Sequence, residues 1–546
     1  MKKNNLSRCL ALALVAAMAL SGCGSKEAAE TTAADAATEA AATEAAKEEK
    51  KEEAAAPAKE ASYKSEVNIA ITANPPSLDV QAVNSNIVGG IGSHVYEPLF
   101  AMNANYEPTA VLADSYEVSE DGKVYTIKLR EGIMFHNGKE MVADDVVASM
   151  TRWLEKSGKA KALLDGTVFE KVDDYTVTMT LPEAYADVMT VISASIQFAA
   201  IQPVEVIESA SEEGITEFIG TGPYKLAEWK QDQYVHLTKY DGYQQPEGES
   251  SGFTGRKEAY ATDLYFRVVT DNTTRIAGVQ TGQYDIAEDI PLERYAELSA
   301  DTNVELNSKT AGSLNLFFNT TTGIMANPDI RQAIMACLNC EDIMYAAYGD
   351  PNLYVLNPGW CNPDDAMWGS DGGSEYYNQN DIAKAKELLT KAGYNNEEII
   401  LVTTPDYAEM YNATLVVQAQ LISAGINAVV ESYDFATFME HRADPNQFDL
   451  FITSNRYNLS PVQLSVLTKD WAGLNHEDVD AGIHAIRFAA SAEESSAKWT
   501  ELQTFLYEYG AASVLGHYSG VIANGANVEG FNYFDFPLYW NTRVPE

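Results

Sequence analysis

Cysteine and histidine are scarce in this chain, which has five cysteines and seven histidines in 546 residues. No two histidines stand in the His-x-x-x-His or His-Glu-x-x-His spacing that places both imidazoles on one helical face. A Gly-x-Ser-x-Gly nucleophile elbow is missing as well. The sequence therefore contains no recognisable catalytic set and no metal-ligand set, and we expect neither an enzyme nor a protein with a cofactor.

Two of the cysteines, Cys337 and Cys340, form a Cys-x-x-Cys, a spacing that can indicate redox or metal chemistry. The run IRQAIMACLNCEDIM reads as one helix, so both sulfurs would share a helical face. Because no second pair and no histidine stands nearby, we favour buried structural thiols over a reactive or metal-binding pair.

Positive charge is also in short supply, with 37 Lys and Arg against 79 Asp and Glu and a net charge of −42. This balance argues against a nucleic-acid partner and against peripheral binding to anionic lipid. After the first 23 residues, no stretch approaches 18 uninterrupted apolar residues, so no transmembrane helix is predicted there. A chain of this length is too long for a single core, and we expect at least two lobes.

Residues 1–23 have the composition of a targeting segment. Lys2, Lys3 and Arg8 precede a short apolar core, and Leu-Ser-Gly-Cys at its end matches the lipobox of bacterial lipoproteins. Cleavage before Cys23 would leave this cysteine to carry diacylglycerol, whose two acyl chains suffice for stable anchoring. We expect an anchored, extracytoplasmic protein, on the outer surface of a Gram-positive-type cell or the periplasmic side of a Gram-negative one. An ordinary cleavable signal with an incidental cysteine is the alternative.

Residues 24–62 are rich in Ala, Glu, Thr and Lys and contain no aromatic residue. Such a segment cannot bury enough apolar surface to offset its ordering entropy, so we predict a disordered tether. A coil of this length reaches roughly 35 Å root-mean-square, enough to carry a folded body clear of a lipid surface.

Residues 112–153 predict a hairpin, a turn and a helix. Asp121-Gly122 stands between two segments of alternating polarity and indicates a type I′ hairpin turn, and Asn137-Gly138 marks a second turn. Val146, Val147, Met150 and Leu154 then recur at helical spacing, and acidic residues occupy the first turn of that helix. We interpret this stretch as scaffold, and His136 within it as a structural histidine.

The residue order of this stretch, LADSYEVSEDGKVYTIKLREGIMFHNGKEMVADDV, closely resembles the signature of the family 5 extracellular solute-binding proteins of ABC importers. Two residues depart from the usual pattern: Tyr116 replaces Trp, and Val142 replaces Thr. The second change removes a helix-capping hydroxyl, a loss of about 1 kcal/mol if nothing compensates. Further elements that resemble the family follow in order: SLD, YEPLF, IGTGPY, GVQTGQYD, FFN with PDIRQA, and AKELLTKAG.

The resemblance implies an α/β fold of the two-lobed periplasmic-binding-protein kind (type II, of the large cluster C sort) with a hinge. Its first lobe is discontinuous and carries an extra subdomain. We expect lobe I to comprise residues 63–310 and 516–546, and lobe II residues 311–515. The family's role is to capture a solute, commonly a peptide, between the lobes and to deliver it to permease subunits served by separate ATPase subunits. We expect a monomer.

The ligand-specifying segment departs from the family. Peptide binders usually carry an Asp in a G-W-x-x-D-x-x-D-P run that pairs with the peptide's amino terminus, whereas residues 448–463 read FDLFITSNRYNLSPVQ. Asn455, Arg456, Tyr457 and Asn458 stand where that Asp is expected. An Arg offers a planar donor fork for a carboxylate or phosphate, although it is also a plausible rim residue paired with an acid. A non-peptide solute, such as an oligosaccharide, an organic acid or chelated nickel, therefore stays open, and a surface enzyme or adhesin is a third hypothesis.

Other positions complete the predicted site. Glu288 and Asp289 follow the GVQTGQYD element and are suited to bind an amine, and two tryptophans and a tyrosine are candidate stacking walls or core residues. The glycine-rich run VNSNIVGGIG either faces the ligand or forms a loop before a packed helix. The candidate ligand-binding residues are Asn86, Glu288, Asp289, Trp360, Asn455, Arg456, Tyr457, Trp471 and Tyr518.

Overall fold

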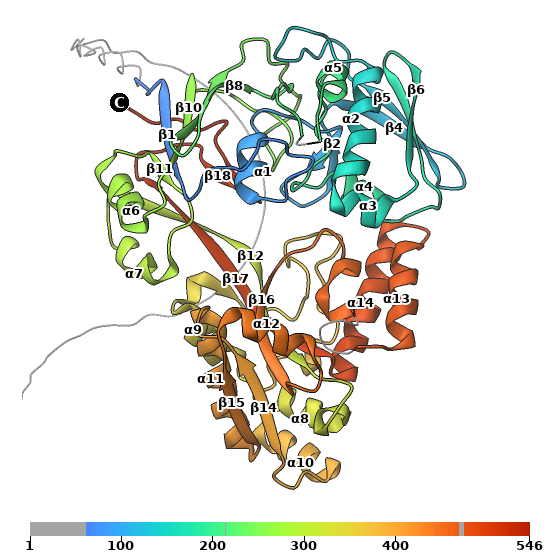
Figure 1. Cartoon of the computed structure of the whole chain (residues 1–546), viewed down its shortest axis with the longest axis vertical. Helices are drawn as coiled ribbons and strands as arrows, with labels where there is room; N and C mark the ends of the chain where they lie inside the picture. The colour runs from blue at the N-terminus through green and yellow to red at the C-terminus, as the bar shows by residue number, and fades with distance from the viewer. Residues whose placement is uncertain (1–61, 213, 469–473) are drawn as a thin grey trace, which may run out of the picture. The chain divides into compact units, whose positions relative to one another are not determined.

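The structure is a computed structural model that describes residues 62–212, 214–468 and 474–546 (Figure 1). The predicted signal peptide with Cys23, the tether up to residue 61 and Trp471 lie outside the described residues. Within the three described ranges, no helix is both long and apolar enough to cross a bilayer.

An eleven-stranded sheet runs through the body in the order β15-β14-β16-β12-β17-β11-β1-β10-β9-β8, with β13 added beside β17. Its strands are β1 (Glu66–Ile71), β8 (Tyr224–Lys230), β9 (Tyr234–Lys239), β10 (Asp263–Val268), β11 (Ile286–Ala287), β12 (Val304–Phe318), β13 (Tyr354–Val355), β14 (Glu398–Thr403), β15 (Asn427–Ser432), β16 (Leu450–Arg456) and β17 (Ala512–Gly525). β1 pairs in parallel with β10 and β11, and β14 with β15 and β16. The sheet is therefore mixed, as expected of an α/β fold.

The two long strands β12 and β17 join the two lobes (Figure 1). They pair antiparallel from Val304–Gly525 to Phe317–Ala512, and the register shifts between Thr310 and Gly312 and again between Leu314 and Asn315. The far end of β17 pairs with β11, so the end of the chain returns to the sheet in which it began. Lobe I is thus discontinuous, as the fold class requires. Bulges bend and twist a strand, and we propose these two as the hinge, beside the expected lobe boundary at residues 310 and 311.

The predicted hairpin lies in a separate four-stranded sheet, β4-β5-β7-β6, made of β4 (Ala113–Val118), β5 (Val124–Leu129), β6 (Val168–Asp173) and β7 (Thr176–Thr180). The hairpin between β4 and β5 is confirmed, but the predicted turn type is wrong. Of the two expected central residues of the turn, Asp121 and Gly122, only Gly122 has positive φ, at 70°. Its N–H donates to the Ser119 carbonyl at 2.9 Å. Because Asp121 is not left-handed, the turn is a type I turn closed by a glycine, not type I′.

Asp145 compensates for the capping hydroxyl that Val142 lacks at the start of α2 (Ala143–Lys156). Its carboxylate accepts the Val142 N–H at 3.0 Å and pairs with the Lys139 ammonium at 2.5 Å. This is the reciprocal half of a capping box, so one orphan donor at the helix start is satisfied without a Thr.

The Cys-x-x-Cys segment is two helices, and the prediction of a single helix is wrong. α8 (Pro328–Cys337) ends at Leu338, whose backbone is extended, and α9 (Cys340–Tyr348) begins after Asn339, whose side chain accepts the Asp342 N–H. The N-cap preference of Asn prevails over the apolar periodicity that runs through the break. Both thiols are buried and free, and burial raises the pKa of each to about 12, so neither is a reactive thiolate at neutral pH.

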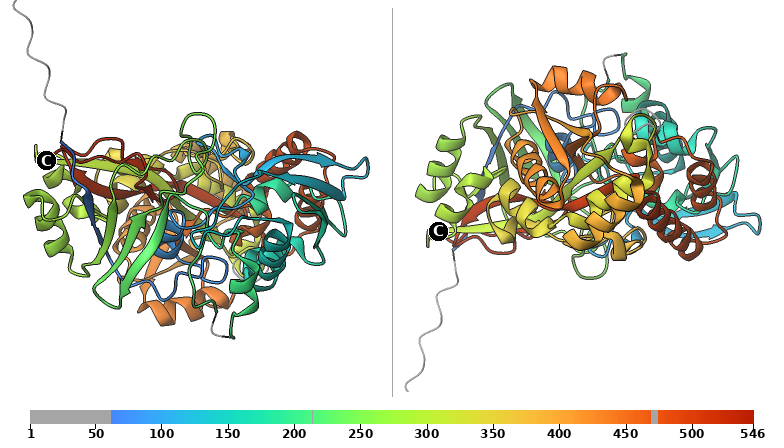
Figure 2. Two further views of the ribbon diagram at one scale, coloured as in Figure 1. Left: turned by 90° about the horizontal axis from the view of Figure 1, so that it is seen from above. Right: turned by 90° about the horizontal axis from the view of Figure 1, so that it is seen from below.

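Helices and strands alternate in lobe II as predicted, and Figure 2 shows helices packed around its strands when seen from below. The helices of this lobe after α9 are α10 (Ile382–Ala392), α11 (Ala408–Ala424), α12 (Phe435–Ala443), α13 (Glu477–Arg487) and α14 (Ala492–Tyr509). Gly393, at φ 72°, ends α10 as the sequence predicts.

Lobe I carries the remaining short elements. Its helices are α1 (Asn86–Gly92), α3 (Gly158–Leu164), α4 (Val188–Ile192), α5 (Val204–Glu208), α6 (Asn272–Thr281) and α7 (Tyr295–Leu298). Its paired short strands are β2 (Phe100–Met102) with β3 (Pro108–Ala110), and β18 (Asn532–Tyr533) with β19 (Pro537–Leu538). The glycines of α1 allow close packing, because a Cβ on Gly92 would lie 2.2 Å from Val80 and one on Gly89 2.8 Å from Phe536.

Several residues of the family-like elements form a buried polar network in lobe I. Glu97 of YEPLF accepts from Lys257 at 2.7 Å, from Tyr243 at 2.9 Å and from Thr221 of IGTGPY at 3.0 Å. His136 lies 3.0 Å from the carbonyl of Gly222, and burial lowers its pKa to about 4. His136 is therefore a neutral structural residue, and these elements position the scaffold.

Candidate ligand-binding site

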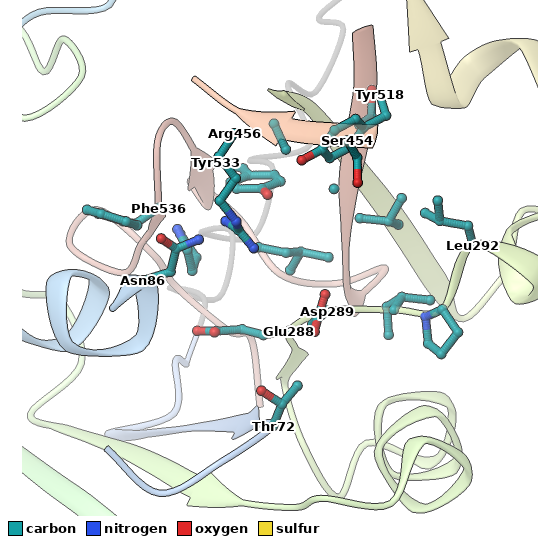
Figure 3. Close-up of a pocket in the computed structure, with 18 of the residues that line it drawn as sticks. Thr72, Asn86, Glu288, Asp289, Leu292, Ser454, Arg456, Tyr518, Tyr533 and Phe536 are labelled. Atoms are coloured by element: carbon teal, nitrogen blue, oxygen red, sulfur yellow. The ribbon is translucent and has the colours of Figure 1, made fainter. Parts of the chain in front are cut away.

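A cavity of about 1310 Å³ lies between residues of lobe I and lobe II (Figure 3). The end of β1, the start of α1 and the segment after β11 form one side, and α9, the start of α11 and the end of β16 form another. Residues of β17, the segment 533–537 and single residues of α3, α6 and β12 also belong to the lining. The volume exceeds the roughly 300–1,000 Å³ typical of small-molecule pockets, so there is room for an extended solute or for a smaller one with water.

Six of the nine predicted residues line this cavity. They are Asn86, Glu288, Asp289, Arg456, Tyr457 and Tyr518. Asn455 is not in the lining, and its side-chain oxygen instead accepts from Asn315 at 3.0 Å. Trp360, offered as a stacking wall, is a core residue: it is 3% exposed and packs edge-on against Phe317. The reason is that residue 360 lies in a segment packed against α14, where the backbone N–H of Trp360 donates to the Gln503 side-chain oxygen.

Glu288 and Asp289 are presented to the cavity by a backbone turn that a buried arginine holds. Arg275, 1% exposed, donates to the carbonyls of Glu288 at 3.2 Å and Asp289 at 2.9 Å. Asp289 adopts φ 56°, a left-handed conformation that Asp tolerates better than most residues. The turn therefore projects two carboxylates in succession from the end of β11.

Glu288 has an unusual proton affinity. Burial raises its pKa to about 7, the Tyr539 hydroxyl that donates to it at 2.5 Å opposes this, and the neighbouring charge of Asp289 adds to it. Near neutral pH the carboxyl group is therefore only partly ionised. A cation placed beside it would favour the ionised form.

Arg456 enters the cavity from the end of β16, on the side opposite Glu288 and Asp289 (Figure 3). Within the described part of the chain, its guanidinium has no hydrogen-bond or ion-pair partner. Burial raises the pKa values of Tyr518 and Tyr533, and the positive charge of Arg456 opposes both shifts. The guanidinium thus stands near two tyrosine hydroxyls with its donor fork free.

The cavity contains charged residues that the sequence analysis missed, because they stand in no recognisable motif. Besides the predicted Glu288, Asp289 and Arg456, the charged lining residues are Lys159, Glu293, Glu409 and Asp535. Lys159 belongs to α3 and Asp535 to the segment between β18 and β19. No sequence spacing could have connected these two positions, which are brought together only by the return of the chain end to lobe I.

The two lobes also meet at a second place, away from β12 and β17 (Figure 1). Arg487 at the end of α13 donates to the Leu163 carbonyl at 2.5 Å, and its own carbonyl accepts the Ala186 N–H at 3.0 Å. Its guanidinium lies 4.3 Å from the Tyr185 ring and 3.8 Å from the buried Asp187 carboxylate. The cavity is therefore bounded by lobe-to-lobe contacts in addition to the connecting strands.

Two lobes joined by a pair of long strands, with a large cavity between them whose lining carries charges of both signs, define a solute-binding protein of the two-lobed kind. Residues 107–468 match the bacterial extracellular solute-binding proteins, family 5, middle region, and the chain belongs to this family.

Individual relatives agree with this assignment. The glutathione-binding protein GsiB of Escherichia coli O1:K1 is 30% identical over 378 residues, which cover 68% of this chain and 70% of that protein. The structure of the ABC transporter substrate-binding protein CtaP of Listeria monocytogenes superposes with a TM-score of 0.74 at 21% identity, covering 86% of this chain and 96% of that one. NikA of Brucella suis in complex with Fe(III)-EDTA gives 0.73 at 20% identity, covering 88% and 100%. These two structures bear on the fold alone.

Proposed function

We propose that this protein is the solute receptor of an ABC importer and that it binds a peptide or peptide-like solute with both an amine and an acid group. The observation that carries this proposal is the guanidinium of Arg456, which has no partner among the described residues and faces Glu288 and Asp289 across the cavity. The guanidinium is suited to bind a carboxylate through two parallel hydrogen bonds. The two acids are suited to bind an ammonium group.

The charge in the ligand-specifying segment is opposite to the one that peptide binders of this family usually have there. Peptide binders of this family place an acid after the β16-equivalent strand to hold the amine, whereas this chain places Arg456 there. In our proposal the acid end of the solute is bound by lobe II and the amine end by the turn after β11. Such a solute bridges the two lobes, which favours their closure around it.

In this role the receptor would need transporter subunits as partners and an anchor in the membrane. We propose that Cys23 carries the lipid that attaches the protein to the extracytoplasmic face of the cell membrane. A monomer tethered in this way would meet its permease subunits at the membrane, and separate ATPase subunits would power transport. We also propose residues 63–310 with 516–546 as lobe I and 311–515 as lobe II.

A solute that is not a peptide is the second candidate. Arg456 in place of the amine-binding Asp favours an anionic solute, and the Brucella suis relative of similar fold is seen with an iron chelate. An organic acid or a carboxylate-rich chelate would use Arg456 in the same way and would leave Glu288 without a cationic partner.

Mass spectrometry of the solute that co-purifies with the protein tests the two candidates directly. The folded body is released from its native host under non-denaturing conditions, and the bound solute is extracted and fragmented. Peptide fragments are the expected result. Calorimetry against a library of two- to five-residue peptides provides the second measurement, and a library without any binder would contradict the peptide assignment.

The affinity for an amine-bearing peptide is expected to increase with pH. The pKa of Glu288 is raised to about 7 mainly by burial, so below that pH the peptide's ammonium must displace a proton before it can form an ion pair. Calorimetry from about pH 5.5 to 7.5, where an α-amine stays largely protonated, should show tighter binding at the higher pH and proton release at the lower.

Glu288→Gln is the control for this prediction, because it keeps the shape of the side chain and removes its titration. It should bind more weakly than the wild type at pH 7.5 and should show a flatter pH profile. An unchanged profile in this variant would mean that another group titrates. In the free protein the protonated carboxyl favours the fold, so Glu288's contribution to stability should be lost as pH rises from 4.5 to about 7.

A further inference from the structure

We infer that the cavity has a second anion-binding position at Lys159, and that the solute is an acidic peptide with a second carboxylate besides the one at Arg456. The inference rests on the proposed function and narrows its solute class. It is carried by a lysine that lines the cavity and has no partner among the described residues, together with a half-buried carboxylate near it.

Lys159 is the second residue of α3 and is half-buried in the cavity wall. Among the described residues its ammonium has no hydrogen bond and no ion pair. Acids outnumber bases by 79 to 37 in this chain, so partners are plentiful elsewhere. Lys309, for comparison, pairs with Asp364 at 2.8 Å. A half-buried ammonium that no described residue pairs with is available to a ligand.

The carboxylate of Asp535 favours the charged form of Lys159 in the cavity wall. Burial lowers the pKa of Lys159, and the negative charge of Asp535 opposes that shift. The Asp535 oxygens accept from the Ser195 hydroxyl at 2.7 Å and the Tyr106 hydroxyl at 3.0 Å. Among the described residues no ion pair joins Asp535 to Lys159, so Asp535 acts on Lys159 through its field and the ammonium keeps its donors for the solute.

The other charges of the cavity set the polarity of the solute. Glu288, Asp289, Glu293, Glu409 and Asp535 repel a carboxylate, so an anionic group finds favourable positions only beside the two cations, Arg456 and Lys159. Glu288 and Asp289 accept the solute's amine. A peptide with one amine and two carboxylates matches this distribution, whereas a peptide with a single carboxylate leaves Lys159 desolvated and unpaired.

Matched peptide pairs test the inference. The probes are tripeptides of Ala in which one position at a time is Glu or Gln, so the members of each pair differ only in one charge. Calorimetry with the wild type should show that at least one Glu peptide binds roughly tenfold or more tightly than its Gln partner, the effect expected for a charged hydrogen bond. Lys159→Gln should reduce that ratio to about one, and Lys161→Gln, on the exposed side of the same helix, should leave it unchanged.

The possible outcomes separate the two proposals. Binding of peptides with no preference between Glu and Gln overturns the second anion position and leaves the proposed function standing. Binding of no peptide overturns both. A preference that survives in Lys159→Gln overturns the role of Lys159, provided that thermal unfolding shows the variant to be folded. A preference lost equally in Lys161→Gln overturns it too, because the effect would then be one of general charge.

Discussion

Arg152→Met is expected to lower the free energy of unfolding by about 3–5 kcal/mol, the typical cost of removing one partner from a buried ion pair. Arg152 and Asp79 are 5% and 2% exposed. The guanidinium donates to both oxygens of the Asp79 carboxylate, at 3.0 Å to one of them, and to the Gln81 side chain at 2.7 Å. Without Arg152, Asp79 must either remain charged without an ionic partner or take up a proton, and both cost free energy.

Chemical denaturation followed by tryptophan fluorescence measures this loss. The double variant Asp79→Asn with Arg152→Met is the matched control, because it removes both charges and should recover a large part of the stability. A single variant that loses less than about 1 kcal/mol would show that water or a rearranged neighbour satisfies Asp79. The pair connects the SLD element to the helix of the hairpin-turn-helix stretch, so the experiment also tests the structural role of two family-like elements.

Arg456→Ala is expected to weaken the binding of a carboxylate-bearing solute by about 1.5–3 kcal/mol, or roughly 10- to 150-fold in Kd. The side chain is exposed to the cavity and unpaired among the described residues, so its removal takes away a ligand contact and breaks no ion pair there. For the same reason the thermal stability of the free protein should change little. Calorimetry with the co-purified solute or with the tightest peptide measures the affinity.

Arg256→Ala is the matched control, since Arg256 is an exposed arginine of lobe I outside the cavity lining. It removes the same charge from the protein and should leave the affinity within about twofold, as expected for a charge screened by solvent. An Arg456→Ala variant that binds as tightly as the wild type would remove Arg456 from the site. Carboxylate recognition would then depend on Lys159 alone or on backbone donors.

Local signals account for most of what could be predicted about the fold. Alternating and helical periodicities located the β4–β5 hairpin, α2 and the strand-helix series of lobe II, because these patterns depend on neighbours a few residues apart. Predictions from these periodicities were least reliable where two local conformational preferences compete. Asn339 separates two helices within an unbroken apolar pattern. Asp121 does not adopt the left-handed conformation that a type I′ turn requires.

The sequence by itself therefore determined the family, the two-lobed architecture and the acid pair and arginine that were expected to bind the solute. Tertiary structure alone decided which of these face one another. It placed Trp360 in the core, left Arg456 without a partner in the described part of the chain and brought Lys159 near Asp535. The physical reason is that a cavity is formed by segments hundreds of residues apart, whose packing and charges depend on long-range contacts that no local pattern contains.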